Sequence, residues 1–125
     1  MRLLLDTHVF LWCVKGDKQL GKATRATIAR ATDVYVSSAS IWEAAIKKAL
    51  GKLEVDIELL VQSISSSGFI ELPITAQHAA AVASLPSLHR DPFDRILIAQ
   101  ALCEPLRFLT SDSALKSYSD LVDIA

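Results

Sequence analysis

The sequence predicts a single three-layer α/β domain with a mainly parallel central sheet of four to five strands. Short apolar or β-branched runs alternate with longer amphipathic stretches along the 125 residues, as strands and helices alternate in such folds. The chain is 51% hydrophobic and 22% charged, a composition that suits one folded core. No internal repeat or linker divides residues 1–125, so we expect one domain.

Five segments are expected to be strands. Residues 3–5 are an uninterrupted leucine run, and residues 34–36 are β-branched and aromatic; both patterns are typical of buried strands. The remaining strands are expected at residues 69–72, 107–110 and 121–124.

Helices are expected in the stretches between the strands. The clearest covers residues 41–50 and is followed by Gly51, a common C-terminal stop. Pro92 suits the first turn of another helix, because proline lacks an N–H that this position does not need. The full set is expected at residues 7–14, 23–31, 41–50, 56–66, 76–85, 92–103 and 112–118.

Four acidic residues stand where apolar or small-residue stretches give way to these helices: Asp6, Glu43, Asp94 and Asp112. If the strands are parallel, their helix-entry ends share one edge of the sheet, where open α/β sheets place ligands. Four carboxylates crowded at one edge repel one another unless a hard cation holds them, and Mg²⁺ or Mn²⁺ prefers oxygen ligands. The pattern therefore predicts a metal-dependent active site.

Each acid also has a structural interpretation, because helix N-termini attract Asp and Glu. Asp6 and Asp112 are placed to cap helices, and Ser40 with Glu43 matches the S-x-x-E capping box. Asp91, just before Pro92, is expected to be an N-cap, with a peripheral contact to a second metal as the alternative. Capping explains each acid singly, but it does not require all of them to converge on one edge.

The basic residues after Glu43 have two interpretations. Lys47 is four residues beyond Glu43, which favours an intrahelical ion pair. Alternatively, lysines and arginines form a rim that guides a phosphodiester toward the acids. The rim residues would be Lys47, Lys48, Lys52, Arg90 and Arg95. The net charge of −1 argues against sequence-blind coating of nucleic acid but does not exclude a nuclease.

Aromatic and histidine residues near the acids are expected to be mainly structural. Trp12 and Trp42 are expected to pack in the core, and stacking of a base on Trp42 requires an exposed ring. His8 is close to Asp6 and within reach of a substrate phosphate, although a packing role is the simpler expectation.

Four separated motifs resemble those of PIN-domain proteins, in particular the VapC-type toxins of bacterial toxin–antitoxin pairs. They are Leu4-Leu5-Asp6-Thr7-His8, Ile41-Trp42-Glu43 with Leu50-Gly51-Lys52, His89-Arg90-Asp91-Pro92-Phe93-Asp94-Arg95, and Leu109-Thr110-Ser111-Asp112. The motifs occur in the family's order and span nearly the whole chain. The chain departs from the family in the small residues Ala44 and Ala45 after the helix glutamate, which is consistent with variation in packing.

The resemblance implies a Mg²⁺- or Mn²⁺-dependent endoribonuclease that hydrolyses RNA phosphodiester bonds with metal-activated water and leaves a 5′-phosphate. Asp6, Glu43, Asp94 and Asp112 would be the catalytic, metal-binding acids. Thr110 would support the site by hydrogen bonding, and we expect it to contact substrate together with the rim residues Arg95 and Lys47. The resemblance also implies a homodimer and inhibition by a small antitoxin protein.

Two other functions are compatible with a small acidic α/β domain. Phospho-accepting receiver-like domains share an acidic pair after the first strand and a Lys-Pro pair late in the chain, and neither feature occurs here. A binding module that has lost activity is disfavoured by the presence of all four acids. No apolar run approaches the ~18 residues of a membrane helix, and Asp6 and His8 interrupt the only signal-like segment, so we expect a cytoplasmic protein.

Overall fold

The computed structural model describes residues 1–87 and 90–125; His89, in the third motif, lies outside them. Within these residues the strands form one parallel sheet in the order β3-β2-β1-β4-β5. The predicted α/β fold with a parallel sheet is therefore confirmed. The strands are β1 (Arg2–Leu5), β2 (Asp33–Ser37), β3 (Ile70–Leu72), β4 (Arg107–Thr110) and β5 (Val122–Ile124).

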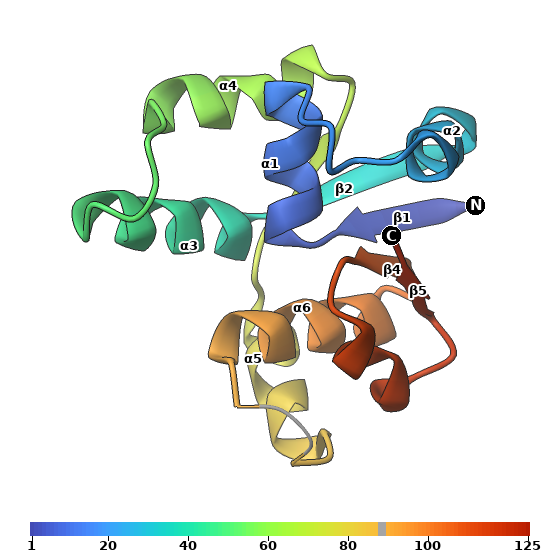
Figure 1. Cartoon of the computed structure of the whole chain (residues 1–125). Coiled ribbons are helices and arrows are strands. Elements are labelled where there is room, and N and C mark those ends of the chain that lie inside the picture. The colour runs from blue at the N-terminus through green and yellow to red at the C-terminus, as the bar shows by residue number, and fades with distance from the viewer. Residues whose placement is uncertain (88–89) are drawn as a thin grey trace.

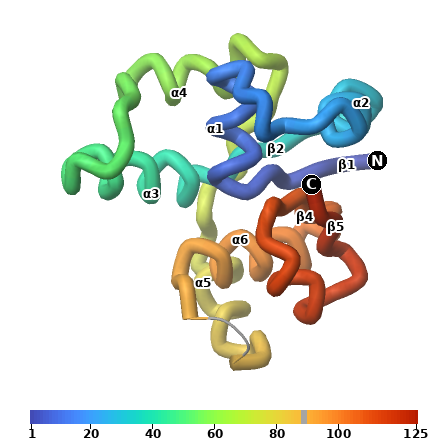
Figure 2. Tube along the Cα trace, in the orientation of Figure 1, coloured from blue at the N-terminus to red at the C-terminus, as the bar shows by residue number. Residues whose placement is uncertain are grey.

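Helices lie on both faces of the sheet, as Figures 1 and 2 show, with α1, α2 and α4 on one side and α5, α6 and the 3₁₀ helix η2 (Ser113–Tyr118) on the other. The third helix, α3, projects from the edge of the sheet between these two groups. The α-helices are α1 (Thr7–Lys15), α2 (Lys22–Arg30), α3 (Ser38–Ala49), α4 (Ile57–Ser66), α5 (Ala76–Ala81) and α6 (Pro92–Cys103). No helix in the described ranges has the length and apolar character needed to cross a membrane.

Alternation along the strands divides the core into two clusters. Leu3 and Leu5 of β1 pack in one cluster, whereas Leu4 packs in the other, because successive strand side chains point to opposite faces. In β4, Phe108 and Leu109 are divided between the clusters in the same way. A strand buried on both faces is apolar at every position, which explains the uninterrupted leucine run.

The order of the strands creates a switch point between β1 and β4. The chain proceeds from β1 through β2 to β3 on one side, then returns to place β4 and β5 on the other side. Just after β1 ends, the Asp6 N–H donates to the carbonyl oxygen of Leu109 in β4 at 2.9 Å, which joins the carboxyl ends of the two strands. Ligands of open α/β sheets bind at such a crevice.

Two expected helices differ in type from the prediction. Residues 76–85 divide into α5 and a 3₁₀ turn, η1 (Val82–Ser84), and the last helix is a 3₁₀ helix, η2 (Ser113–Tyr118). Short connectors commonly take the tighter 3₁₀ form, which has no distinct sequence period over so few residues.

The expected burial of Trp42 is wrong, because its side chain is 59% exposed. The buried face of α3 is formed by Ala39, Ser40, Glu43 and Ala44, and Trp42 falls outside this face. Trp12, in contrast, is half-buried and packs against the core, as expected.

Candidate active site

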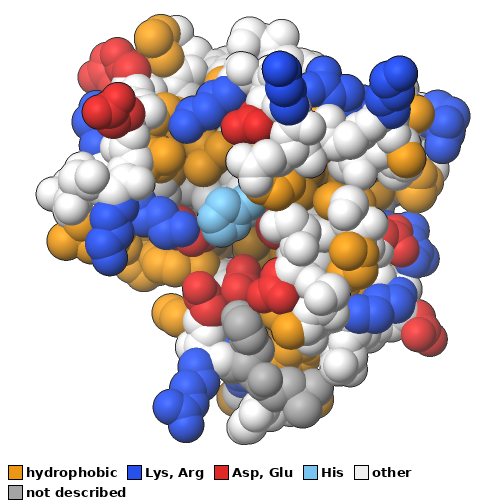
Figure 3. Space-filling view, in the orientation of Figure 1, with side chains coloured by type: hydrophobic (Ala, Val, Ile, Leu, Met, Phe, Trp, Pro, Cys, Tyr) orange, Lys and Arg blue, Asp and Glu red, His pale blue; other side chains and the backbone are white. Residues whose placement is uncertain are grey.

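An acidic pocket of about 460 Å³ lies at the carboxyl edge of the sheet. All four acids predicted from the sequence line it, so residues from across the chain do meet in one place. Figure 3 shows acidic side chains gathered in the middle of this face, with a histidine beside them and basic side chains to one side. The lining residues are Asp6, His8, Glu43, Lys47, Asp91, Asp94, Ser111 and Asp112.

Asp6 is fixed at the base of the pocket by hydrogen bonds to both carboxylate oxygens. Its Oδ1 accepts from the Val9 N–H at 2.7 Å and so caps α1. Its Oδ2 accepts from the Thr110 hydroxyl at 2.6 Å and from the Ser111 N–H at 3.1 Å. The residue is only 4% exposed. Capping and a place in the pocket are therefore compatible, since each uses a different oxygen.

Burial raises the pKa of Asp6 above the ordinary aspartate value. The hydrogen bonds from Thr110, Val9 and Ser111, and the nearby His8, lower the pKa but do not cancel the effect of burial. Ionisation of this carboxylate is therefore less favourable than that of an ordinary aspartate, and an added positive charge would oppose the effect of burial.

Glu43 is not part of a capping box, and that expectation was wrong. The helix α3 begins three residues earlier than predicted, with Ser37 as its N-cap accepting from the Ala39 N–H at 3.0 Å. Glu43 consequently lies within the helix, is 7% exposed and pairs with Lys47 at 2.9 Å between Oε2 and Nζ. The intrahelical ion pair expected for Lys47 is confirmed.

Ser40 has a different partner from the one that a capping box requires. The Thr7 hydroxyl donates to Ser40 Oγ at 3.0 Å in the buried contact between α1 and α3. This bond ties the helix that follows Asp6 to the helix that carries Glu43.

The other acids that line the pocket lie at the starts of α6 and η2. Asp91 caps α6, as predicted, by accepting from the Phe93 N–H at 2.8 Å and the Asp94 N–H at 3.3 Å. Asp94 is half-buried in the first turn of α6. Asp112 caps η2 by accepting from the Ala114 N–H at 3.0 Å, while its own N–H donates to the Thr110 hydroxyl oxygen at 3.1 Å. These acids thus cap or begin a helix and also line the acidic pocket.

The donor set of the acidic pocket fits a hard divalent cation. Every acidic ligand is a carboxylate oxygen, the ligand that Mg²⁺ and Mn²⁺ prefer. Among residues 1–87 and 90–125, no group of three or more His, Cys, Asp or Glu side chains is placed to hold a metal ion. A Mg²⁺ site does not require such a group, because this ion usually keeps several waters and takes one or two carboxylates together with substrate phosphate oxygens.

The three residues expected to contact substrate lie in different surroundings. Lys47 lines the pocket, whereas Thr110 is fully buried beneath Asp6 and holds this carboxylate in place. Arg95 instead donates to the carbonyl oxygens of Pro86 and Val82, at 2.8 and 3.2 Å, and does not line the pocket. Contact of Arg95 with substrate stays a prediction.

Sequence reasoning gave too little weight to two residues of the pocket. His8 is exposed and lines it, a position signalled only by its place two residues after Asp6 at the helix start. Ser111 contributes its backbone N–H to Asp6, and no side-chain pattern identifies a backbone donor.

The fold and the pocket define a parallel α/β domain with an acidic pocket at the switch point of its sheet. The chain belongs to the PIN-domain family, whose model matches residues 3–121. The expected family is thereby confirmed.

The chain is also similar to a named ribonuclease and to chains in solved complexes. It is 29% identical to Ribonuclease VapC22 of Mycobacterium tuberculosis over 118 residues, and this aligned region covers 93% of this chain and 91% of that protein. Its fold is similar to that of VapBC2 from Rickettsia felis, solved with a promoter DNA fragment, at a TM-score of 0.71, 14% identity and coverage of 100% and 98% of the two chains. A toxin–antitoxin complex from Klebsiella pneumoniae gives a TM-score of 0.67, 18% identity and coverage of 97% and 95%.

Proposed function

We propose that the protein is a Mg²⁺- or Mn²⁺-dependent endoribonuclease. The observation that carries this proposal is the convergence of Asp6, Glu43, Asp94 and Asp112 on one pocket at the switch point. A divalent ion held there would lower the pKa of bound water and neutralise charge that develops on the phosphate. The name of the relative Ribonuclease VapC22 supports RNA as the substrate.

The protein's own residues would prepare the site for this chemistry. Thr110 and Ser111 hold Asp6 Oδ2, so that this carboxylate keeps one orientation in the pocket. Lys47, paired with Glu43, presents a cation beside the acids that can contact a phosphate oxygen of the RNA. Ser111 and His8 both line the pocket, but among the described residues no hydrogen bond joins them, and Ser111 contributes its backbone N–H to Asp6, which favours attack by water.

We further propose that the protein is a toxin that a small antitoxin protein inhibits. The similarity of the fold to a toxin–antitoxin complex from Klebsiella pneumoniae, and to VapBC2 from Rickettsia felis, supports this role. The family resemblance also favours a homodimer acting in the cytoplasm, where the RNA substrate is available. Sedimentation equilibrium over a range of concentrations measures the oligomeric state directly.

Binding of Mn²⁺ is expected to raise the melting temperature of the parent protein, and Asp94→Asn is expected to suppress this rise. An ion that binds only the folded state stabilises it by ~2.7 kcal/mol when present at 100 times its dissociation constant. The measurement is a melting curve with increasing MnCl₂, accompanied by RNA cleavage with and without EDTA. EDTA and Asp94→Asn should each abolish cleavage.

Glu58→Gln is the matched control for Asp94→Asn, because Glu58 lies in the first turn of α4, outside the acidic pocket. This variant should keep both the Mn²⁺ response and cleavage. A parent protein that cleaves RNA equally well in EDTA would refute the metal-dependent proposal.

Thr110→Val is expected to reduce cleavage by roughly 10- to 100-fold, the usual range for residues that position a metal ligand. The hydrogen bond from Thr110 lowers the pKa of Asp6 in the parent protein. Its loss should therefore raise that pKa further and move the acid limb of the pH–rate profile to higher pH. Thr27→Val is the control, since the Thr27 hydroxyl, within the described part of the chain, donates to the Ala23 carbonyl oxygen of its own helix, α2. An unshifted acid limb in Thr110→Val would contradict the positioning role.

A further inference from the structure

His8 lines the acidic pocket with polar atoms that the folded chain does not use. The residue is exposed and lies in the first turn of α1. In the described part of the chain, no hydrogen bond or ion pair engages its ring nitrogens. The imidazole therefore brings to the pocket a hydrogen-bond donor that is left for a ligand.

Trp12 limits where the His8 ring can lie. The two residues are one helical turn apart on α1, and their ring centroids are 6.3 Å apart with planes inclined by 47°. Aromatic rings at this separation attract each other. Trp12 is half-buried and packs against the core, so it gives the imidazole a fixed neighbour. This contact favours one position of the ring at the wall of the acidic pocket.

The acidic pocket offers a substrate few side-chain donors. Five of the described residues that line it are carboxylic acids, which only accept hydrogen bonds when ionised. The two lining side chains with an N–H are His8 on α1 and Lys47 on α3. The Lys47 ammonium already pairs with Glu43 at 2.9 Å. A phosphodiester presents only acceptors at its nonbridging oxygens, so His8 is the donor best able to meet one of them.

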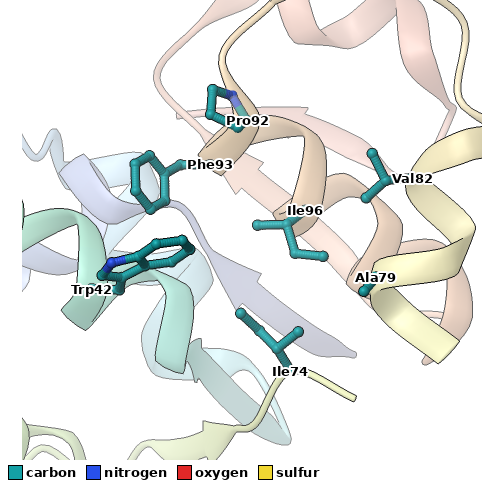
Figure 4. A pocket seen from close by; sticks show the side chains of 7 residues that line it. All are labelled: Trp42, Ile74, Ala79, Val82, Pro92, Phe93 and Ile96. Carbon is teal, nitrogen blue, oxygen red and sulfur yellow. The ribbon is translucent and has the colours of Figure 1, made fainter. Parts of the chain in front are cut away.

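An apolar pocket of about 330 Å³ between α3, α5, η1 and α6 offers no comparable partner for a phosphate. Figure 4 shows the apolar side chains that face this space from these helices and from the segment after β3. The Trp42 indole N–H is the single side-chain donor among the described residues that line it. Contacts to the cleaved phosphate are therefore expected within the acidic pocket itself.

The chemistry of the ligands separates His8 from the metal-binding acids. Imidazole suits Zn²⁺, Cu²⁺ and Ni²⁺, whereas carboxylate and water oxygens suit Mg²⁺ and Mn²⁺. The pocket already supplies carboxylates for the metal. A donor to the substrate is consequently the role that fits His8 better than a place in the coordination sphere.

We propose that an imidazole N–H of His8 donates to a nonbridging oxygen of the phosphate that is cleaved in the acidic pocket. This inference rests on the proposed ribonuclease function and adds to it a residue that touches the substrate. Neutral imidazole carries one N–H and the cation carries two, so the contact is available in either state. His8 and Lys47 would hold the phosphate from two different helices, α1 and α3.

Substitution of His8 tests the contact. His8→Leu should lower kcat/KM for RNA by roughly 10- to 100-fold, the effect of losing one hydrogen bond to a charged group. His8→Asn and His8→Gln carry an amide N–H near one or the other ring nitrogen, and one of them should recover most of the loss. Gln19→Leu is the matched control, because Gln19 is exposed between α1 and α2, outside the acidic pocket. Parent-like cleavage by His8→Leu would overturn the contact.

Sulfur substitution in the RNA identifies the atom that His8 contacts. After the cleaved bond is mapped, sulfur, a weaker acceptor, replaces each nonbridging oxygen of that phosphate in turn. Each replacement should slow the parent. In His8→Leu, one of the two effects should disappear, because that oxygen no longer has a donor to lose. Two undiminished sulfur effects in His8→Leu would overturn the contact.

A melting curve with increasing MnCl₂ separates contact with the phosphate from ligation of the metal. His8→Leu should keep the rise in melting temperature that Mn²⁺ gives the parent, since the acids that bind the ion are unchanged. Loss of this rise would make His8 a metal ligand and overturn the proposal.

Nuclear magnetic resonance distinguishes failure of this contact from failure of the ribonuclease function. The protein has three histidines, and the ring signals of His8 are assigned from their loss in His8→Gln. In saturating Mg²⁺, at constant pH and ionic strength, dimethyl phosphate should shift the His8 signals to saturation and leave those of buried His78 unchanged. This shift without RNA cleavage by the parent would refute the ribonuclease function but not the phosphate contact. Cleavage without the shift would overturn the contact alone.

Discussion

Asp6→Asn is expected to lower RNA cleavage by more than about 100-fold, beyond the range typical of residues that merely position a ligand. The substitution removes the negative charge at the base of the acidic pocket, where Asp6 is buried and fixed by three donors. Rates under single-turnover conditions with saturating Mn²⁺ measure the loss.

The fold of Asp6→Asn should survive. Asn keeps an oxygen that can accept from the Val9 N–H, so the helix cap is retained. The raised pKa of Asp6 also means that its ionisation weakens folding. The protonated carboxyl therefore contributes stability that is fully present below the pKa of the unfolded chain and is lost as the pH rises through the higher folded pKa. The neutral amide of Asn does not ionise, so it avoids this loss of stability near pH 7.

Asp56→Asn is the matched control for Asp6→Asn. Asp56 also caps a helix through its Oδ1, by accepting from the Leu59 N–H, but it does not line the acidic pocket. The control should cleave RNA at the parent rate. Parent-like cleavage by Asp6→Asn would remove Asp6 from the catalytic set.

Phe108→Ala is expected to lower the free energy of unfolding by about 3–5 kcal/mol, the largest stability effect predicted here. The Phe108 side chain is fully buried in β4, in the core cluster that also holds Leu97, Leu106 and Leu115. The substitution removes this contact area and leaves a cavity beneath α6 and η2. Urea denaturation followed by circular dichroism measures the change.

Leu59→Ala provides the comparison for Phe108→Ala, because the Leu59 side chain is 61% exposed on α4. Its effect should remain within about 0.5 kcal/mol. A loss below about 1 kcal/mol for Phe108→Ala would contradict the packing described for the sheet.

Much of the fold could be predicted from local patterns. The leucines of β1 and the β-branched residues of β2 identified buried strands, and Pro92 identified the start of α6. The order of the strands could not be derived in the same way, since an apolar strand has the same sequence at any place in a sheet. The switch point between β1 and β4 therefore came only from the structure.

The acids of the site could be predicted more completely than their surroundings. Convergence of the four acids follows from parallel strands, but the partners of each side chain depend on small shifts in helix starts. Because α3 begins at Ser38, Glu43 lies in the interior of the helix and not in its first turn. Trp42 lies outside the buried face of the same helix and is exposed. Arg95 was expected at the rim, but backbone carbonyl oxygens of the preceding segment hold its guanidinium.

The bond between Thr110 and Asp6 joins residues 104 positions apart. Ribosomes add residues from the N-terminus onward, so Asp6 emerges long before the strand that carries its hydroxyl partner. The centre of the sheet also stays open on one side of β1 until β4 arrives. A nascent chain interrupted before residue 107 consequently lacks the assembled pocket, and translation must proceed through β4 before the molecule acquires it.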